Sequence, residues 1–166
     1  DTGDNPLPAG QTGFIRYRGP SVADGFFRHP GSGGAAFKSG WFYPGDLGCL
    51  DEDGFLFLMG RAKDIIIRGG VNIYPAEIEQ VLVTHRDIVD AAVVGWESRI
   101  KGEEIAAFVV PTDGVTINSK ALLDYCSDFL APYKIPKGIF VLEELPKNSV
   151  GKVKKADLVA KLPPTN

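Results

Sequence analysis

The sequence has few of the residues that build metal centres and disulfide frameworks. Its 166 residues include two cysteines, two histidines and one methionine. Cys49 and Cys126 stand alone, without neighbours at metal-ligand spacing. We therefore expect no metal site, and we expect both cysteines to be reduced residues that pack in a core rather than to form a disulfide. This cysteine usage gives a cytoplasmic location as the default.

Long apolar runs and long basic runs are also absent. No stretch approaches the roughly 20 apolar residues that a helix needs to cross a bilayer, and no signal peptide is visible. The formal net charge is −3, and no cluster of Lys and Arg is long enough to predict a nucleic-acid surface. With 44% hydrophobic and 23% charged residues, the composition is that of a soluble globular protein.

Glycine, by contrast, is abundant in the first sixty residues. Short strands are expected over 13–19 and 55–58, with a hairpin turn over 51–54 and no helix. Such a part leaves a sheet edge or face open, because nothing covers it. The loop 31–34 resembles a phosphate-binding loop only superficially, since the Lys-Ser/Thr ending is missing, and neighbouring His29 has no second metal ligand. We expect a flexible loop there.

The pattern changes after this part to alternating helices and strands. Pro75 suits the first position of a helix, and Glu77 lies where the helix dipole favours negative charge. Helices are expected over 75–85, from 118 or 119 to a stop at Pro132, and over 154–162; strands are expected over 89–96, 105–110 and 138–142. The predicted class is α+β: a glycine-rich β part over 1–61, then a small domain over 62–166 with an antiparallel sheet and about three helices.

Three segments, in this order, resemble the adenylate-forming superfamily, which includes acyl- and aryl-CoA ligases, luciferases and peptide-synthetase adenylation domains. They are Gly40-Trp41-Phe42-Tyr43-Pro44-Gly45-Asp46, the stretch 60–79, and Pro146-Lys147-Asn148-Ser149-Val150-Gly151-Lys152. The resemblance covers nearly the whole chain. It implies the C-terminal third of such an enzyme: residues 1–61 as a remnant of the large AMP-binding domain and 62–166 as the small C-terminal domain. The phosphate loop and acid pocket of the family lie upstream.

The resemblance implies a two-step reaction. A carboxylate attacks ATP to give an acyl-adenylate, and a thiol, usually that of CoA, then displaces AMP. The parent would be an acid–thiol ligase with ATP and CoA as substrates, and Mg²⁺ would accompany ATP, bound mainly outside these residues. The wording Gly69-Gly70-Val71-Asn72-Ile73 is closer to CoA ligases than to peptide-synthetase domains. We expect the chain alone to be inactive, since its partner, the upstream large domain, supplies the acid pocket.

Three residues receive a chemical role by this resemblance. Lys152 would be the catalytic lysine, whose compact ammonium bridges the substrate carboxylate and the α-phosphate. Asp46 would accept hydrogen bonds from the two ribose hydroxyls, and Arg61 would also reach the nucleotide. From the residues alone, Lys152 could equally be an exposed loop lysine, and Asp46 a good turn residue.

Three further residues receive a role in domain movement and thiol access. Lys63 matches the hinge about which the small domain turns between the two steps. Gly69 and Gly70 would wall the CoA tunnel, although an ordinary β-bulge would use the same pair. Pro44 departs from the family, which usually has threonine there, and it removes a hydroxyl and a backbone donor from the nucleotide site.

Two other functions stay open from the sequence. The chain could belong to an adenylation domain that serves a carrier protein. It could also be a non-catalytic module that binds a nucleotide, a protein or a second copy of itself, because an uncovered sheet permits self-association. The carboxylic acid cannot be read from the sequence, since its pocket lies outside this chain.

Overall fold

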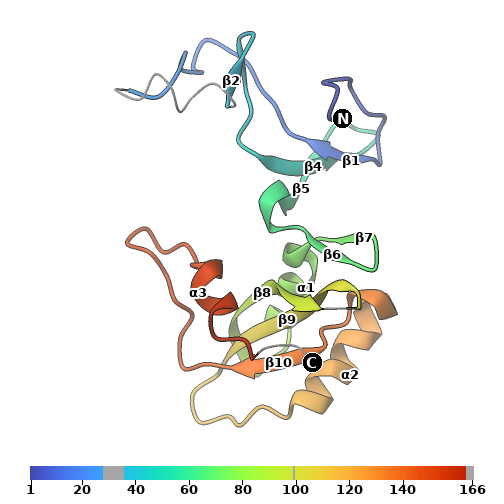
Figure 1. Cartoon of the computed structure of the whole chain (residues 1–166), viewed down its shortest axis with the longest axis vertical. Coiled ribbons are helices and arrows are strands. Elements are labelled where there is room, and N and C mark those ends of the chain that lie inside the picture. Colours follow the sequence, from blue (N-terminus) through green and yellow to red (C-terminus); the bar gives the residue numbers. More distant parts are fainter. Residues whose placement is uncertain (28–35, 99, 164–166) are drawn as a thin grey trace. The chain divides into compact units, whose positions relative to one another are not determined.

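A computed structural model describes residues 1–27, 36–98 and 100–163, so the expectations for His29 and for the loop 31–34 lie outside the described residues. Backbone contacts divide the chain into two compact units, Asp1–Lys63 and Asp64–Asn166 (Figure 1). The division falls two residues after the boundary that the sequence predicts. That the two units correspond to a large-domain remnant and a small domain stays a prediction.

The first unit is built from short antiparallel strands. Strand β4 (Asp46–Leu50) pairs with both β1 (Thr12–Phe14) and β5 (Leu56–Arg61), and β2 (Phe37–Lys38) pairs with β3 (Trp41–Phe42). The predicted turn lies between β4 and β5, where Asp51 Oδ1 accepts the N–H groups of Asp53 and Phe55 at 3.0 and 2.8 Å. The strand expected over 13–19 is shorter, because the chain leaves the sheet after Phe14 and pairs again only as a single bridge between Tyr17 and Phe42.

One strand of this unit keeps its apolar side chains in solvent. In β5, Leu56, Phe57 and Leu58 are 50%, 56% and 67% exposed. Leu47 is the one large hydrophobic residue that is buried in the described part of the unit. The expectation of an uncovered sheet is therefore confirmed.

The second unit is organised by a long hairpin. Strands β8 (Ile88–Ser98) and β9 (Gly102–Pro111) pair antiparallel over their whole length. The β6–β7 hairpin (Ile66–Arg68 and Val71–Ile73) joins β9 where Arg68 faces Gly102. Strand β10 (Gly138–Val141) lies parallel to β9. The α+β class and the antiparallel pair are confirmed, whereas the parallel β10 was not foreseen; the chain between β9 and β10 includes a helix, as a parallel connection requires.

Local signals explain where the helices begin. Pro75 opens α1 (Pro75–Val83), and Asn118 Oδ1 accepts the N–H of Ala121 at 3.2 Å at the start of α2 (Ser119–Phe129). The remaining helices are α3 (Lys155–Val159) and two short 3₁₀ segments, η1 (Ala62–Asp64) and η2 (Pro132–Lys134). Both α1 and α3 are shorter than predicted. Of the helices within the described residues, none has the length and apolar character to cross a membrane.

The second unit has a core on each face of the β8–β9 sheet, because alternate side chains of a strand point to opposite faces. One face packs against α1 and α2 and contains the buried residues Ile78, Leu82, Val93, Ala107, Leu122 and Cys126. The other packs against α3 and contains Ala92, Val94, Ala106, Phe108, Leu145 and Leu158. Cys126 and Cys49 are both free; Cys126 is fully buried, as expected, whereas Cys49 is only half-buried.

Candidate functional site

The structure brings Asp46 and Arg61 together. The two residues face each other where β4 begins and β5 ends. Arg61 Nε donates to Asp46 Oδ1 at 3.1 Å, and its Nη2 donates to the carbonyl of Pro44 at 2.9 Å. Gly45, with φ of +80°, accepts the N–H of Ala62 at 2.9 Å. The turn around Asp46 is therefore fastened to the end of β5 by three hydrogen bonds.

This pair remains open to a ligand. The side chains of Asp46 and Arg61 are 35% and 49% exposed, so the pair itself contributes less than about 1 kcal/mol to stability. Asp46 Oδ2 makes no hydrogen bond within the part of the chain that the structure describes, which leaves an acceptor for hydroxyl groups. Pro44 contributes its carbonyl to Arg61 rather than a hydroxyl to a ligand. Any residue at position 44 would supply this carbonyl, so the contact does not explain the proline.

Lys63 lies in η1, and the division between the two units follows it directly. Its side chain is exposed and makes no hydrogen bond or ion pair with any described residue. A short 3₁₀ segment has poor hydrogen-bond geometry and is common as a connector between elements. The position is therefore compatible with the hinge role, which stays a prediction.

Gly69 and Gly70 form the turn between β6 and β7, with φ of +58° and +82°. A Cβ atom at either position would meet no atom within 4 Å. Glycine is required by the left-handed backbone and not by lack of space. Gly69 N–H donates to the carbonyl of Lys101 at 2.9 Å, which ties this turn to the β8–β9 connection.

A buried ion pair next to this turn was not predicted from the sequence. Glu104, 4% exposed, is the one buried charged residue among the described residues. Its Oε2 lies 2.6 Å from Arg68 Nε, in a geometry that makes an ion pair but no hydrogen bond, and its Oε1 lies 3.2 Å from Lys101 Nζ. Arg68 Nη1 also donates to the carbonyl of Tyr133 at 2.8 Å. Since a buried carboxylate needs compensating charge, Arg68 is held in one place, directly before Gly69.

Lys152 lies in an exposed turn closed by Asn148. Asn148 Oδ1 accepts the N–H of Lys152 at 2.9 Å, and Asn148 N–H donates to the carbonyl of Lys152 at 2.9 Å. Gly151, with φ of +80°, provides the left-handed residue that the turn needs. The Lys152 amine has no ion-pair partner among the described residues. The backbone here is ordered by hydrogen bonds while the ammonium is free to contact a ligand.

The structure does not bring all predicted residues of the second unit together. Figure 1 shows the loop that carries Lys152, which precedes α3, and the β6–β7 turn, which carries Gly69 and Gly70, on different sides of this unit. The two predicted functions of the unit thus lie on separate surfaces of it. No group of three or more His, Cys, Asp or Glu side chains suited to a metal ion occurs within the described ranges.

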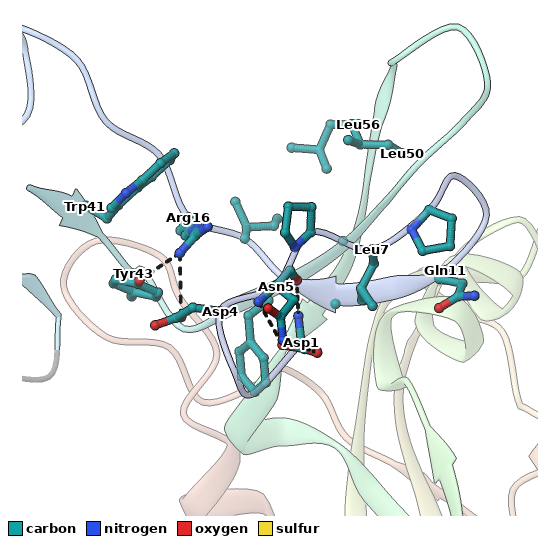
Figure 2. Close-up of a pocket in the computed structure, with 16 residues that line it drawn as sticks. Asp1, Asp4, Asn5, Leu7, Gln11, Arg16, Trp41, Tyr43, Leu50 and Leu56 are labelled. Carbon is teal, nitrogen blue, oxygen red and sulfur yellow. Dashed lines mark hydrogen bonds and ion pairs between the residues drawn. The ribbon is translucent and has the colours of Figure 1, made fainter. Parts of the chain in front are cut away.

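The first unit also contains a pocket of about 440 Å³. Figure 2 shows Arg16 beside Trp41, with Tyr43 and Asp4 near its guanidinium. Arg16 lies 4.4 Å from the centre of the Trp41 ring, and its Nη1 donates to Tyr43 Oη at 3.3 Å. Neither Asp46 nor Arg61 lines this pocket. It is therefore distinct from the predicted nucleotide pair.

Comparisons with known proteins agree with the motifs. The AMP-binding enzyme C-terminal domain family matches residues 77–152. A 2-succinylbenzoate–CoA ligase of Geobacillus kaustophilus is 40% identical over 160 residues, which are 96% of this chain and 33% of that protein. An indoleacetate–CoA ligase of Aromatoleum aromaticum is 42% identical over 158 residues, 95% of this chain and 31% of that protein.

Solved structures give the same result. The o-succinylbenzoate CoA synthetase of Bacillus subtilis, in complex with its acyl-adenylate intermediate, has a TM-score of 0.87 and 39% identity over 92% of this chain and 31% of its own. An amide bond synthetase of Marinactinospora thermotolerans has a TM-score of 0.90 and 33% identity over 96% of this chain and 33% of its own. The chain spans about a third of the length of these proteins. The matches identify it as a counterpart of the C-terminal part of the adenylate-forming enzymes.

Proposed function

We propose that the chain acts as the C-terminal portion of an ATP-dependent acid–CoA ligase. The observation that supports this most is the Lys152 turn: an unpaired, exposed ammonium on a backbone closed by Asn148, within the residues that match the C-terminal domain family. A point charge held on an ordered loop can stabilise negative charge that develops on two groups at once. In the first step these groups are the attacking carboxylate and the α-phosphate of ATP.

Asp46 and Arg61 would hold the nucleotide in this proposal. Asp46 Oδ1 is already bonded to Arg61, so Oδ2 is the oxygen that is available to accept from the ribose hydroxyls. Arg61 uses Nε and Nη2 for contacts within the chain, and its Nη1 would approach a phosphate or ribose oxygen. The pair then orients ATP but performs no bond-making step.

The second step would use a different surface. Lys63 would absorb the rotation that replaces the Lys152 loop with the β6–β7 turn, and CoA would pass along the backbone of Gly69 and Gly70. The separate locations of the turn and of the Lys152 loop on the second unit support this division (Figure 1). One surface would serve adenylate formation and the other thiol transfer.

The remaining parts of the site would come from outside the chain. ATP and CoA are substrates of the complete enzyme, Mg²⁺ would enter with ATP, and the acid would bind in an upstream large domain. The apolar strand β5, with Phe57 and Leu58 exposed, offers a surface for that domain, since about 25 cal/mol is gained for each Å² of apolar surface removed from water. We also propose a cytoplasmic location.

A fusion tests the proposal. Residues 1–166 replace the matching third of the Bacillus subtilis o-succinylbenzoate CoA synthetase, and CoA-dependent AMP release is measured with o-succinylbenzoate. We expect activity from the fusion and none from the truncated enzyme or from the 166-residue chain alone. Activity of the chain by itself, or a correctly folded fusion that forms no acyl-adenylate, would overturn the proposal.

The acceptor needs a separate assay, because one of the similar structures is an amide bond synthetase. The fusion is supplied with CoA, with an amine, and with a carrier protein bearing a pantetheine arm. Thioester formation with free CoA is the expected result. Transfer to the amine or to the carrier protein alone would assign the chain to the corresponding other type of enzyme.

A further inference from the structure

We propose that Glu79 and Lys155 form a positioning pair for the turn that carries Lys152. The meaning of the pair for catalysis rests on the proposed function, whereas its effect on the turn does not. Lys155 Nζ lies 2.9 Å from Glu79 Oε1 and 3.0 Å from the carbonyl of Val93. The same Glu79 oxygen accepts the N–H of Val93 at 2.8 Å. Three groups from α1, β8 and α3 therefore meet at one point.

The pair provides hydrogen-bond partners for backbone groups at an unpaired edge of the sheet. In the described residues β8 pairs with β9 alone, and in an antiparallel pair the N–H and C=O of one residue point to the same side. Those of Val93 point away from β9, to Glu79 and Lys155. Since Val93 is fully buried, these backbone groups need partners within the protein. The carboxylate supplies an acceptor and the ammonium a donor, so neither side chain can replace the other.

The same contact fixes the chain segment that follows the Lys152 turn. Lys155 follows Lys152 by three residues, a chain length of at most about 10 Å. Between them, Val153 forms a bridge with Lys147, and Lys154 N–H donates to the carbonyl of Pro146 at 2.8 Å. The position of the Lys155 ammonium therefore limits where the turn can place the Lys152 amine.

The chain segment that precedes the turn is held by a weaker ion pair. Lys147 Nζ lies 2.7 Å from Asp90 Oδ2, but these side chains are 45% and 33% exposed, against 28% and 24% for Lys155 and Glu79. Exposed pairs contribute little. Of the two anchors, the Glu79–Lys155 pair is the one whose loss leaves a buried carbonyl without its donor. We therefore assign the orientation of the turn to this pair.

A purely structural role must be separated from positioning, and α1 offers a matched control. Lys134 Nζ contacts Glu77 at 2.6 Å, also a partly buried pair, but it connects α1 to η2 rather than to the Lys152 turn. Lys134→Met and Lys155→Met thus each remove an ammonium that contacts a glutamate of α1. A general loss of stability would affect the Lys152 turn equally in both variants.

The first test measures backbone order in the 166-residue chain by NMR, with ¹⁵N{¹H} NOE values for 148–152 and amide exchange at Val93. In Lys155→Met, Glu79 loses the cation that holds its carboxylate against the Val93 N–H. We therefore expect lower NOE values in the turn and exchange at Val93 that is faster by roughly tenfold, as for the weakening of a hydrogen bond to a charged group. Lys155→Arg, which keeps a cation and its donors, should restore both, and Lys134→Met should change neither. If Lys155→Met does not fold, Glu79→Gln, which keeps an acceptor but loses the charge, takes its place.

The second test uses the fusion enzyme. Lys155→Met should slow acyl-adenylate formation by roughly tenfold while the thioester step from supplied acyl-adenylate is unchanged; Lys134→Met should leave both steps alone. An unchanged turn in Lys155→Met, or the same loosening in Lys134→Met, would overturn the positioning role. A loosened turn with both catalytic steps unchanged would instead contradict the function proposed for Lys152, so the two failures are distinguishable.

Discussion

The buried pair of Glu104 and Arg68 predicts a large and specific loss of stability. Glu104→Ala leaves the Arg68 guanidinium, 16% exposed, without its carboxylate. Removing one partner of a buried pair costs about 3–5 kcal/mol. Arg68 keeps its hydrogen bonds to the carbonyls of Tyr133 and Ile135, so we expect a loss somewhat below this range, about 2–3 kcal/mol.

Urea unfolding measures this cost. Trp96 lies in β8, its ring 5.6 Å from that of Phe140, so its fluorescence reports on the second unit once Trp41 is replaced by Phe. With a urea m-value of about 1 kcal/mol/M for a unit of this size, the midpoint should fall by about 2–3 M. Lys147→Met, which removes a half-exposed ion pair, should shift it by less than about 1 M.

A double variant separates the pair from its surroundings. Arg68→Met/Glu104→Met replaces both charges with apolar groups, so its stability should exceed that of the matching single variants Arg68→Met and Glu104→Met, since neither charge is left buried alone. The reasoning is refuted if Glu104→Ala moves the midpoint no more than Lys147→Met does. It is refuted equally if the losses of the two single variants simply add in the double variant.

Two further predictions concern a thiol and a glycine. Burial raises the pKa of Cys126 from 9.0 to about 11; the unfolded thiol ionises first, so stability should fall as pH rises from about 9 to 11, and Cys126→Ala should remove this slope. Iodoacetamide should modify Cys49 in the folded chain and reach Cys126 only on unfolding. Equal modification rates for the two thiols in the folded chain would contradict the burial of Cys126. Gly70→Ala and Gly114→Ala both place a side chain at positive φ (+82° and +77°) in open space, and each should cost about 1–2 kcal/mol by urea unfolding. Only Gly70→Ala should also slow the thioester step of the fusion; equal effects on that step would exclude the thiol path.

The parts of the fold that local signals determine could be predicted. Pro75 and Asn118 start their helices because a proline at the first position and a side-chain cap act within one turn of the chain. The β8–β9 hairpin follows from two apolar runs joined by a polar turn. The parallel pairing of β10 was missed, because it depends on contacts between strands far apart in the sequence.

In the candidate site, too, the locally determined features could be predicted and the tertiary contacts could not. The motif around Lys152 predicted a lysine in a turn, and the turn is there. The pairing of Asp46 with Arg61 depends on the register of β4 and β5, which shifts at a bulge between Leu47 and Gly48. Glu104 lies near the start of β9, directly after Glu103, so the sequence does not distinguish it from an exposed residue of the polar turn. Such contacts depend on tertiary packing, which a single sequence does not specify.

The central claim is that the Lys152 ammonium serves adenylate formation. The most direct measurement compares the fusion enzyme with its Lys152→Ala variant in two assays: pyrophosphate release from ATP and acid, and thioester formation from supplied acyl-adenylate. We predict that the first rate falls by roughly 10²–10³, as for the loss of one transition-state contact, while the second is unchanged. Wild-type pyrophosphate release in the variant, or an equal fall of both rates, would contradict the account.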